Sequence, residues 1–458
     1  MQLEKEINRA VRHISAINAQ SLNKEEFSKV VSNVMNDVEA DIHHFDNIES
    51  IILQQGSKKR LVKRYTDCYS TENVLCQCIK QVLDSDFRVR YPNRNKISRS
   101  LFGILSATIQ MADFIIVKFD FKNYFNSISS EYAYKKVIES KISDRLMRDL
   151  ISDFCRKTKY AFAGLPTSNA IAELIASEFD ALLKQEFEPF GVIFYSRYID
   201  DSILILNRHV DEDIVRKKLD YILDAVFYDR AINSQKRCKT RYNHNKYTYI
   251  SRRTLTAAPV SFDFLGYEFW LKESSGKIDI QYGITAEKRL KYRRRLEQII
   301  NRYTDTDSPD YLNTELLRHR VAAFSSREVY LSTRYRTGIW KAKGFISNYG
   351  ELRFLLGTRS LHPETDEYLK TMIKDVFTQA GVMPFFIVDS DKLDSGYNLY
   401  HNMQKNKTLL LVDGIGYDYR ALVNLCNQIG ISNFEVGGEK RTYSSLVREY
   451  LIKVKVGY

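Results

Sequence analysis

The sequence predicts a mixed α+β protein made of several subdomains. Stretches with helical spacing of apolar residues alternate with short β-branched runs along all 458 residues. Hydrophobic residues make up 44% of the chain and aromatic residues 12%, which is enough to build packed cores and excludes a disordered protein. The length allows about two to four domains. Lys and Arg exceed Asp and Glu by 69 to 57, a net charge of +12, which favours a polyanionic partner.

Several classes of protein are not expected from this sequence. The N-terminal stretch is polar and amphipathic and lacks the apolar core of a signal peptide. No apolar run approaches the roughly 18 residues that a membrane span needs. Cys76 and Cys78 are separated by a single residue, closer than in a zinc knuckle, and the six cysteines do not suggest a disulfide framework. We therefore expect reduced, buried thiols in a cytoplasmic protein that has no membrane partner.

The first part of the chain is predicted to be mainly helical around one buried strand. Residues 1–55 have helical spacing and form a helical extension. Basic segments follow at 58–64 and 88–96, and residues 114–120 form an apolar strand that ends in a carboxylate. The helices predicted after the extension lie at 71–83, 130–158, 168–188 and 211–228.

A β-hairpin with acids at its turn is predicted between two of these helices. Runs 192–195 and 202–206 flank Tyr198-Ile199-Asp200-Asp201. The elements predicted beyond the hairpin are short strands up to Trp270, a basic helix at 284–303, a mainly helical region at 310–358, strands at 385–388 and 408–412, and a helix at 419–428. The last of these elements form a small α/β appendage.

The acids at the strand ends are candidates for a metal site. Asp120 ends the buried strand, and Asp200 and Asp201 lie at the hairpin turn. Charges are costly to leave unpaired inside a protein, so carboxylates brought together at strand ends usually bind a cation. Hard oxygen ligands without His or Cys favour magnesium, and two such ions about 3.5–4 Å apart would activate a primer hydroxyl and stabilise a leaving pyrophosphate. The alternative is an ordinary turn, where Asp accepts local backbone hydrogen bonds.

Four sequence blocks around these acids occur in a fixed order. The blocks are Asp120-Phe121-Lys122-Asn123-Tyr124-Phe125, Gly164-Leu165-Pro166-Thr167-Ser168-Asn169, Tyr198-Ile199-Asp200-Asp201 and Phe262-Asp263-Phe264-Leu265-Gly266-Tyr267. This succession resembles motifs A, B, C (YxDD) and E (FxFLGY) of the palm of a reverse transcriptase. The resemblance implies a right-hand polymerase plus a small C-terminal α/β module. The implied divisions are the helical extension (1–55), fingers (56–110), a palm with an antiparallel sheet (111–283), a helical thumb (284–360) and the C-terminal α/β module (361–458).

The resemblance also implies roles for individual residues. Asp120 and Asp200 would bind two Mg²⁺ ions, or Mn²⁺ instead, with Asp201 assisting and with Phe121 counted among the metal-binding positions. Phe125 matches the aromatic residue that blocks a ribose 2′-hydroxyl, which implies deoxynucleotide substrates; the alternative is a core aromatic. The nucleotide-binding positions are Arg90, Arg94, Lys96, Phe125, Gly164, Pro166, Ser168, Tyr198 and Lys236. The primer grip comprises Phe264, Leu265, Gly266 and Tyr267. The nucleic-acid backbone contacts are Lys288, Lys291, Arg294 and Arg295.

The match is looser at some positions. Motif D of the family resembles Ile232-Asn233-Ser234-Gln235-Lys236, but Lys239-Thr240 also fits its basic end. Ala163 stands where many reverse transcriptases carry Gln. The basic segments before motif A resemble the fingers only loosely, and they could be solvated charged turns instead. In the basic helix, Leu290 and Leu296 are expected to face a core while the cations follow phosphates.

The rest of the chain resembles the abortive-infection and defence-associated reverse transcriptases of bacteria, which are related to retron and group II intron enzymes. It shows no RNase H, His-Asn-His or integrase pattern, and it has a helical block near Trp340–Tyr349 followed by its own C-terminal module. Retron enzymes are the second choice, because the Asn-Ala-x-x-His and Val-Thr-Gly segments are missing. The expected function is RNA-directed or non-templated DNA synthesis in antiphage defence. The expected partners are an RNA template, including a dedicated noncoding RNA, a DNA product, deoxynucleotides, and a partner protein or further copies of the chain. A catalytically silent RNA-binding scaffold and an assembly subunit are the alternatives.

Overall fold

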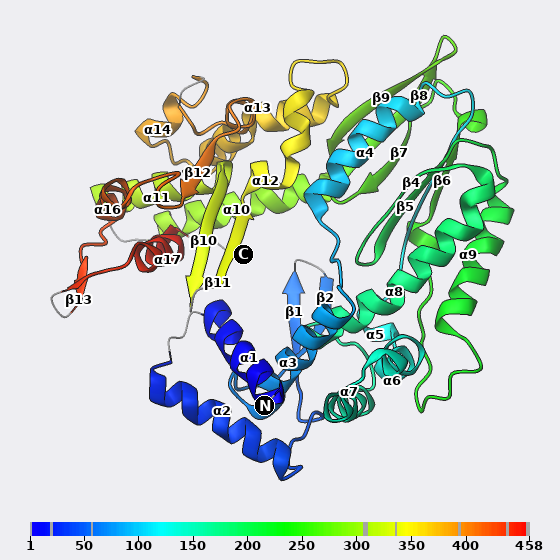
Figure 1. The fold of residues 1–458 in the computed structure, drawn as a ribbon. Helices are drawn as coiled ribbons and strands as arrows, with labels where there is room; N and C mark the ends of the chain where they lie inside the picture. The colour runs from blue at the N-terminus through cyan, green and yellow to red at the C-terminus, as the bar shows by residue number, and fades with distance from the viewer. Residues whose placement is uncertain are drawn as a thin grey trace. The chain divides into compact units, whose positions relative to one another are not determined.

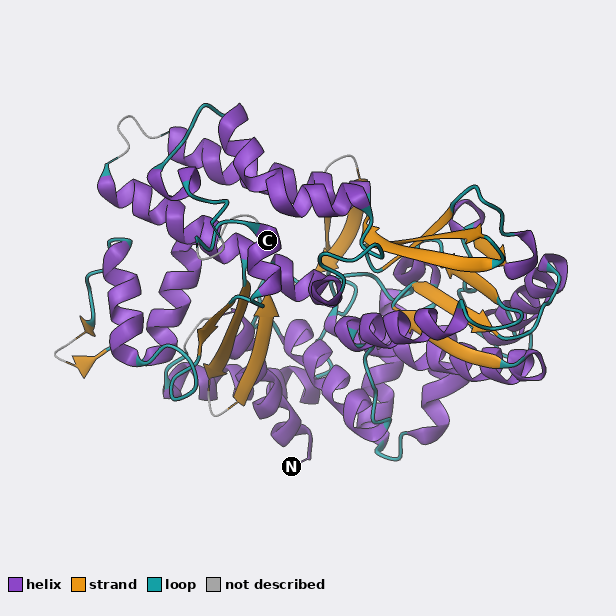
Figure 2. Ribbon diagram, turned by 90° about the horizontal axis from the view of Figure 1, so that it is seen from above, coloured by secondary structure: helices purple, strands orange, loops and turns teal. Residues whose placement is uncertain are grey.

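The computed structural model places the chain in two compact units. It describes residues 2–18, 22–55, 58–305, 310–334, 337–392, 395–436 and 439–454. The first unit contains residues 1–97 and 111–254, and the second contains residues 98–110 and 255–458. In Figure 1 the chain runs from blue at the N-terminus to red at the C-terminus. Figure 2 shows strands gathered into separate sheets with helices around them, which is the arrangement of an α+β fold.

The first unit holds most of the elements predicted before residue 254. Its helices are α1 (Gln2–Asn18), α2 (Lys24–Glu39), α3 (Thr71–Asp86), the start of α4 (Arg94–Thr108), α5 (Tyr124–Ser127), α6 (Ser130–Ala133), α7 (Arg145–Thr158), α8 (Pro166–Phe187) and α9 (Glu212–Phe227). Its strands are β1 (Glu49–Gln55), β2 (Lys58–Arg64), β3 (Ile115–Asp120), β4 (Val192–Tyr198), β5 (Asp201–Leu206) and β6 (Thr248–Ser251). The predicted helices at 71–83, 168–188 and 211–228 and the hairpin at 192–206 are confirmed.

The helical prediction for residues 1–55 is wrong at its end. Strand β1 pairs antiparallel with β2, and Ile52 lies opposite Leu61 in this two-stranded sheet. The β-branched pair Ile51-Ile52 favours a strand, but only the partner strand in the next basic segment makes that conformation stable. Helical spacing in one segment cannot reveal a cross-strand partner.

The helix predicted over 130–158 is interrupted in the structure. Between α6 and α7 the chain forms one π-helical stretch, Tyr134–Ile138, and a 3-10 turn, Glu139–Lys141. Helix α7 then starts anew, because the side chain of Asp144 accepts a hydrogen bond from the backbone N–H of Met147 (2.8 Å) and caps the helix.

A four-stranded antiparallel sheet forms the centre of the first unit. Its strand order is β4-β5-β3-β6, so β3 lies between two neighbours and all six of its residues are buried. Successive side chains of β3 point to opposite faces of the sheet. On one face Phe119 and the following Phe121 meet Phe179 of α8, with ring centroids 6.2 and 5.1 Å apart. Phe227 of α9 lies 6.2 Å from Phe121, so α8 and α9 cover this face. The opposite face carries Asp120.

The second unit consists of two three-stranded sheets, a short two-stranded one and their covering helices. Its strands are β7 (Val260–Phe264), β8 (Tyr267–Ser274), β9 (Lys277–Ile284), β10 (Arg327–Arg334), β11 (Thr337–Lys343), β12 (Thr408–Leu411), β13 (Glu435–Val436) and β14 (Glu439–Lys440). Its helices, besides the end of α4, are α10 (Ala286–Thr304), α11 (Tyr311–Ser325), α12 (Phe345–Tyr349), α13 (Pro363–Gln379), α14 (Phe385–Val388), α15 (Leu399–Gln404), α16 (Tyr419–Gln428) and α17 (Tyr443–Val454). Phe102 of α4 stacks on Tyr282 of β9 at 4.7 Å between ring centroids. The predicted basic helix, the strand at 408–412 and the helix at 419–428 are confirmed.

Two predictions for the second unit are wrong. The helical block predicted near Trp340 is wrong at its start: the region 310–358 contains α11, α12 and a 3-10 turn, but β10 and β11 form a hairpin within it and Trp340 lies in β11. Strand β12 adds parallel to β10, so this hairpin supplies the edge on which the C-terminal segment pairs. Residues 385–388 form one helical turn instead of a strand: Pro384 precedes the turn, and no strand is paired with it in the described structure.

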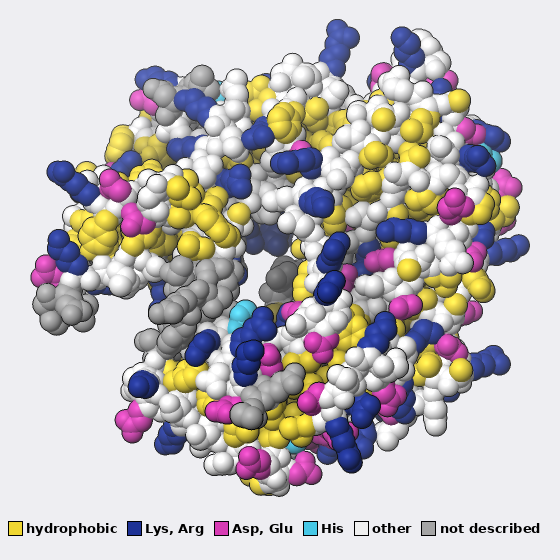
Figure 3. Space-filling model, viewed as in Figure 1, with side chains coloured by type: hydrophobic (Ala, Val, Ile, Leu, Met, Phe, Trp, Pro, Cys, Tyr) yellow, Lys and Arg dark blue, Asp and Glu magenta, His cyan; other side chains and the backbone are white. Residues whose placement is uncertain are grey.

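The cysteines are free and mostly buried, as predicted. All six cysteines are free thiols, and all but the half-buried Cys68 are buried. Burial raises the pKa of Cys76 to about 11 and that of Cys78 to about 12, so both stay protonated at neutral pH. Within the described residues no helix is both long enough and apolar enough to cross a bilayer. On the face shown in Figure 3, Lys and Arg side chains are spread widely and are interspersed with acidic ones.

Candidate active site

The predicted acids lie on neighbouring strands of the central sheet. Asp120, the last residue of β3, is the register partner of Asp201, the first residue of β5. Register partners point to the same face of a sheet and have Cα atoms about 5 Å apart. Asp200 precedes Asp201 in the turn, and its carbonyl accepts a hydrogen bond from the N–H of Phe121 (2.9 Å). The structure therefore brings all three acids together at one end of the sheet.

The turn that carries Asp200 has an unusual backbone. Tyr198 and Asp201 pair at the ends of β4 and β5, which leaves a two-residue loop, and Ile199 in this loop has a φ of 62°. A positive φ is rare for a β-branched residue, since its Cβ crowds the backbone. Strain of this kind persists only where the surroundings enforce it, and it is common at functional sites.

A buried arginine holds this turn in place. Arg197 donates hydrogen bonds to the carboxylates of Glu173 (2.8 Å) and Asp180 (2.9 Å), both on α8. It also donates to the carbonyl of Ile199 (3.0 Å). Only 2% of the Arg197 side chain is exposed, so its charge depends on these two acids for compensation.

Two lysines lie beside the acids. The ammonium group of Lys246, from a short turn before β6, forms an ion pair with the carboxylate of Asp120. Lys118, two residues before Asp120 on the same face of β3, lies 3.4 Å from a carboxylate oxygen of Asp201. Burial acts to lower the pKa of Lys246, but the carboxylates of Asp120, Asp200 and Asp201 outweigh it and raise the pKa above the usual value. The three acids thus create a potential that stabilises a positive charge at this point.

This donor set fits a divalent cation in charge and in chemistry. The acids offer hard oxygen ligands, with no His or Cys among them, which is what Mg²⁺ prefers. In the described part of the chain no three His, Cys, Asp or Glu side chains are already grouped to hold an ion. Lysine ammonium groups pair with Asp120 and Asp201 instead, so ion binding would require them to give way.

The loop of the second block is fixed by close backbone contact. Gly164 has a φ of 107°, and a Cβ at this position would lie 2.3 Å from the carbonyl oxygen of Lys63. The N–H of Lys63 donates to the carbonyl of Ala163 (2.8 Å), so β2 is tied to this loop. Pro166 begins α8, where its fixed φ suits the first helical position. Ser168 is 1% exposed, and its hydroxyl has no hydrogen-bond partner among the described residues.

The two aromatic residues predicted near Asp120 occupy different environments. Phe121 is buried and stacks on Tyr124 at 5.5 Å between ring centroids, as a core residue does. Phe125 is half-buried in the first turn of α5 and meets Tyr124 edge-on at 5.3 Å. Asn123, which precedes the turn, has a left-handed φ of 52°. The chain bends there, and α5 begins at the next residue, Tyr124.

The remaining predicted residues of the first unit lie on other elements than the three acids. Lys236 is exposed in the long loop after α9, where its carbonyl accepts a hydrogen bond from Ser234. Arg90 lines a separate pocket of about 320 Å³ against α8. Arg94 begins α4, and the N–H of Lys96 is capped by the side chain of Asn93 (3.0 Å).

The fourth block forms a tight hairpin in the second unit. Phe264 ends β7 and pairs with Tyr267, the first residue of β8. The two loop residues, Leu265 and Gly266, both have positive φ values, 53° and 81°, as a type I′ turn requires. A Cβ on Gly266 would lie 3.3 Å from side-chain atoms of Lys288, so this turn lies against the start of α10.

The basic residues of α10 separate into two groups. Arg289 pairs with Glu364, and Arg293 pairs with Glu297 (3.3 Å). Lys291 forms no ion pair among the described residues. Its pKa is lowered by partial burial and by the neighbouring Arg295 and Lys288, which outweigh the attraction of Glu287. At Lys291 the neighbouring cations therefore outweigh the nearby acid.

The predicted apolar side of α10 is confirmed for some of its residues only. Leu296, Ile299 and Ile300 are buried, as is usual for the core side of such a helix. Leu290 is 46% exposed, so its predicted core position is wrong. Arg294 is exposed, in agreement with its assignment to the charged side.

The sequence did not reveal Lys246, Arg197, Glu173 or Asp180 as parts of the site. Arg197 could have been suspected from its place in the hairpin, where it is a charged residue between Tyr195 and Tyr198 in an otherwise uncharged strand. Nothing in the local pattern marks Lys246, which lies in a polar loop 126 residues after Asp120.

Comparison with known proteins agrees with this geometry. Residues 52–269 match the family model described as reverse transcriptase (RNA-dependent DNA polymerase). A retron Ec83 reverse transcriptase from Escherichia coli is 29% identical over 157 residues, which cover 32% of this chain and 47% of that protein. The chain thus aligns with about half the length of this curated relative.

Two solved structures of telomerase are also similar over most of the chain. The telomerase of Candida tropicalis, solved with a TWJ fragment of telomeric RNA, has a TM-score of 0.34 and 10% identity over 93% of this chain and 68% of its own. The corresponding complex from Candida albicans has a TM-score of 0.37 and 14% identity with the same coverage. These scores are too low to add to the assignment, which depends on the matched residues 52–269. The chain therefore contains a reverse-transcriptase domain, which is a nucleotidyltransferase domain.

Proposed function

We propose that this protein is a magnesium-dependent DNA polymerase that adds deoxynucleotides to a primer, copying RNA or working without a template. In this proposal the chain has the right-hand arrangement with the predicted fingers, palm and thumb. The observation that carries the proposal is the pairing of Asp120 with Asp201 across β3 and β5, with Asp200 in the adjoining turn. The match of residues 52–269 to reverse transcriptases supports the same chemistry.

Each acid has a distinct place in the proposed reaction. Asp120 and Asp200 would hold two Mg²⁺ ions with the assistance of Asp201, and such ions supply activation of the primer hydroxyl and charge neutralisation of the leaving pyrophosphate. Phe121 would contribute to metal binding through its backbone, whose N–H already donates a hydrogen bond to the carbonyl of Asp200. The rigid turn, held by Arg197, keeps Asp200 at the end of the sheet.

Phe125 is proposed to select deoxynucleotides. It follows Asp120 by five residues and is half-buried beside Tyr124, so part of its ring remains accessible to a substrate. Phe125→Ala should increase ribonucleotide incorporation relative to deoxynucleotide incorporation. Tyr124→Phe is a control for packing, because it keeps the ring beside Phe125 and removes only the hydroxyl that donates to the carbonyl of Ala172 (3.0 Å). Unchanged sugar selection in Phe125→Ala would remove the gating role.

The polymerase proposal is tested with purified full-length protein, labelled deoxynucleotides and Mg²⁺. Asp200→Asn and Asp120→Asn should each abolish incorporation, because each removes one negative charge from the proposed metal site. Asp213→Asn, at an exposed position in the first turn of α9, should retain the wild-type rate. Incorporation that persists in Asp200→Asn, or that falls equally in all three variants, would contradict the proposal.

A role in antiphage defence is the finer part of this proposal. It rests on the resemblance to bacterial abortive-infection reverse transcriptases, and a dedicated noncoding RNA is the expected template. Cells carrying the wild-type chain should form fewer phage plaques than cells carrying Asp200→Asn. Sequencing of the RNA and DNA that copurify with each protein would identify the template and product.

A catalytically silent nucleic-acid scaffold is the second candidate. The ion pair between Lys246 and Asp120 favours it, since an ammonium group already neutralises one of the acids. This candidate predicts RNA binding without any incorporation, and it predicts that Asp200→Asn leaves the plaque count unchanged.

A further inference from the structure

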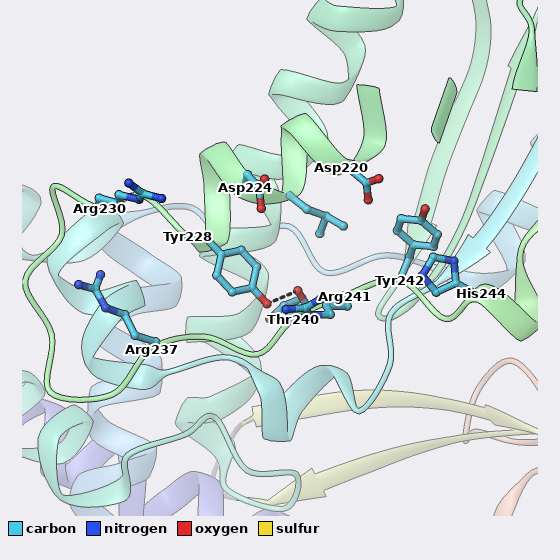
Figure 4. A pocket seen from close by; sticks show the side chains of 10 residues that line it. Asp220, Asp224, Tyr228, Arg230, Arg237, Thr240, Arg241, Tyr242 and His244 are labelled. Carbon is cyan, nitrogen blue, oxygen red and sulfur yellow. Dashed lines mark hydrogen bonds between the residues drawn. The ribbon is translucent and has the colours of Figure 1, made fainter. Parts of the chain in front are cut away.

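A pocket of about 680 Å³ lies in the first unit, beside the end of the central sheet where Tyr242 forms a bridge with Phe121. Its walls come from helix α9 and from the loop that follows it (Figure 4). The volume is within the range of about 300–1,000 Å³ that is typical of small-molecule sites. None of the side chains assigned above to the polymerase reaction lines it.

Three arginines give the pocket its positive charge. Arg230, Arg237 and Arg241 line it, and in the described structure none of them is paired with a carboxylate. The guanidinium of Arg237 donates to the carbonyl of Ile232 (3.0 Å), while that of Arg241 interacts with the hydroxyl of Tyr228. Guanidinium groups with donors left over bind phosphate well, because their planar N–H groups match two phosphate oxygens at once.

The opposite wall offers acceptors and aromatic rings. Asp220 and Asp224 project from α9 above the pocket (Figure 4), and carboxylates accept hydrogen bonds from hydroxyl groups, as Asp220 already does from Tyr242. The rings of Tyr242 and His244 lie together at one end of the pocket, with centroids 4.5 Å apart. Tyr228 lies between the two ends, with its hydroxyl bonded to the carbonyl of Thr240 (2.7 Å).

This combination matches the parts of one kind of ligand. Phosphate complements the arginines, ribose hydroxyls complement carboxylates, and a base complements aromatic rings. A simple inorganic anion would leave Asp220 and Asp224 without a function in the site and would be repelled by them. We propose that this pocket is a second nucleotide site that binds a ribonucleotide, with its phosphate on the arginines and its ribose on the carboxylates of α9.

The pocket is joined to the first block by backbone hydrogen bonds. The carbonyl of Arg241 accepts a hydrogen bond from the N–H of Lys122 (2.8 Å), and Tyr242 forms an antiparallel bridge with Phe121. The N–H of Asn243, the next residue, donates to the carbonyl of Asp120 (2.7 Å). A ligand held by Arg241 and Tyr242 would therefore restrain the segment that ends in Asp120.

The same segment leads to Lys246. His244 begins the one-turn helix His244–Lys246, and Lys246 at its end pairs with Asp120. A ribonucleotide stacked on His244 would act on the orientation of this turn, and through it on the ion pair. The pocket is thus placed to adjust the proposed metal site without taking part in the reaction.

Binding can be measured without polymerase activity. Equilibrium dialysis of full-length Asp200→Asn protein with labelled ATP, in EDTA, reports on the pocket even if the polymerase proposal fails. The double variant Arg230→Ala/Arg237→Ala should weaken ATP binding at least about tenfold, since each charge-assisted bond that is lost costs a sizeable part of the affinity. Arg145→Ala is the matched control: it removes an arginine that is 88% exposed on α7 and outside the pocket.

Two further probes identify the source of the nucleotide and the role of the acids. The first probe is a 5′-phosphorylated single-stranded RNA, compared with ATP. If the RNA binds more tightly than ATP and the arginine variant loses this binding, the pocket holds a nucleotide of a strand. If only ATP binds, the pocket holds a free nucleotide. Either result supports the site. ATP should also bind more tightly than dATP, because only ribose offers the 2′-hydroxyl to the carboxylates.

The outcomes that overturn the proposal are distinct. The first is that the parent protein binds neither ATP nor RNA at millimolar concentration. The second is that the arginine variant binds them as tightly as the parent does and unfolds at the same temperature. Equal affinity for ATP and dATP would overturn the assignment of the ribose to Asp220 and Asp224. A direct readout of that assignment is Asp224→Asn, which should reduce the difference between ATP and dATP.

Discussion

Lys246 forms an ion pair with Asp120, the acid that ends the central strand β3. The pair joins residues that are 126 positions apart and places an ammonium group where the proposed reaction requires divalent cations. The Lys246 side chain is 53% exposed and that of Asp120 only 7%, so the lysine reaches the buried carboxylate from the solvent side. Lysine and metal therefore compete for the same carboxylate.

Lys246→Met should lower the Mg²⁺ concentration needed for half-maximal nucleotide incorporation. Exposed ion pairs contribute about 0.2–1 kcal/mol, so the expected decrease is about fivefold at most. Because the three acids raise the pKa of Lys246, its charge persists at neutral and mildly alkaline pH, and the decrease should be similar at pH 7 and pH 9. A Mg²⁺ titration of the incorporation rate measures the effect.

Lys217→Met is the matched control for that titration. Lys217 is an exposed lysine of α9 that forms no ion pair among the described residues and has no proposed role in the reaction. An unchanged Mg²⁺ requirement in Lys246→Met, or an equal change in both variants, would show that the two cations do not compete.

The acids could be found from the sequence, whereas their lysine partners could not. Asp120 and Asp201 are encoded by local patterns, namely an apolar strand ending in an acid and a hairpin turn, and the alternation of β3 and β5 then places both on one face. Lys246 reaches Asp120 because Asn243 docks on the end of β3 through a backbone hydrogen bond. Such docking depends on the folded chain and leaves no periodic trace in a polar loop.

Errors in the fold have a related cause. Strands β1 and β10 were predicted to be helical, and each is stabilised by a partner that its own residues do not reveal: β2 for the first, and β11 with β12 for the second. By contrast, α8 and α9 were predicted correctly, because their buried residues recur at helical spacing along many turns.

Substitution of the unbalanced cations of α10 should weaken binding of a primer–template duplex. Lys291→Gln with Arg294→Gln removes two exposed cations that form no ion pair among the described residues. If both contact phosphates, the slope of log affinity against log salt concentration should become shallower by about 2, since each phosphate contact contributes about 0.9. Fluorescence anisotropy over a salt series measures this slope.

Arg293→Gln provides the comparison for α10. Arg293 lies on the same helix but is already paired with Glu297 (3.3 Å), so its loss should leave the slope nearly unchanged. A uniform effect of all three substitutions would indicate long-range attraction by net charge and would contradict a specific contact role for Lys291 and Arg294.

Arg197→Met should destabilise the first unit strongly. The substitution leaves the carboxylates of Glu173 and Asp180 partly buried without their cation and removes the donor that holds the carbonyl of Ile199. Removal of one member of a buried ion pair costs about 3–5 kcal/mol. Urea unfolding should show this loss of free energy, while Arg145→Met, at an exposed position, should change it by less than about 0.5 kcal/mol. A change of less than about 1 kcal/mol in Arg197→Met would mean that water compensates the two acids.

Glu328 should make the stability of the second unit depend on pH. Burial in β10 raises the pKa of its carboxyl to about 7, with Lys343, its register partner on β11, opposing the shift only in part. Tyr450 of α17 also interacts with it. The folded chain then binds more protons than the unfolded chain between about pH 4.5 and pH 7, so stability falls as pH rises through this window and stays reduced above it.

Glu328→Gln removes this titration and should therefore stabilise the protein at pH 8 but have little effect near pH 4.5. The gain at pH 8 should be up to about 3 kcal/mol, since each unit of pKa difference corresponds to about 1.4 kcal/mol. Glu364→Gln is a control in which the pH dependence has the opposite sign. Arg289 lowers the pKa of the exposed Glu364 carboxyl. The stability that this ionised carboxylate contributes is therefore present at pH 8 and is lost as pH falls through the lowered pKa. Urea unfolding of the three proteins at both pH values measures these differences. A Glu328→Gln variant that is less stable than the wild type at pH 8 would show that the ionised carboxylate is stabilised by Lys343 more than it is destabilised by burial.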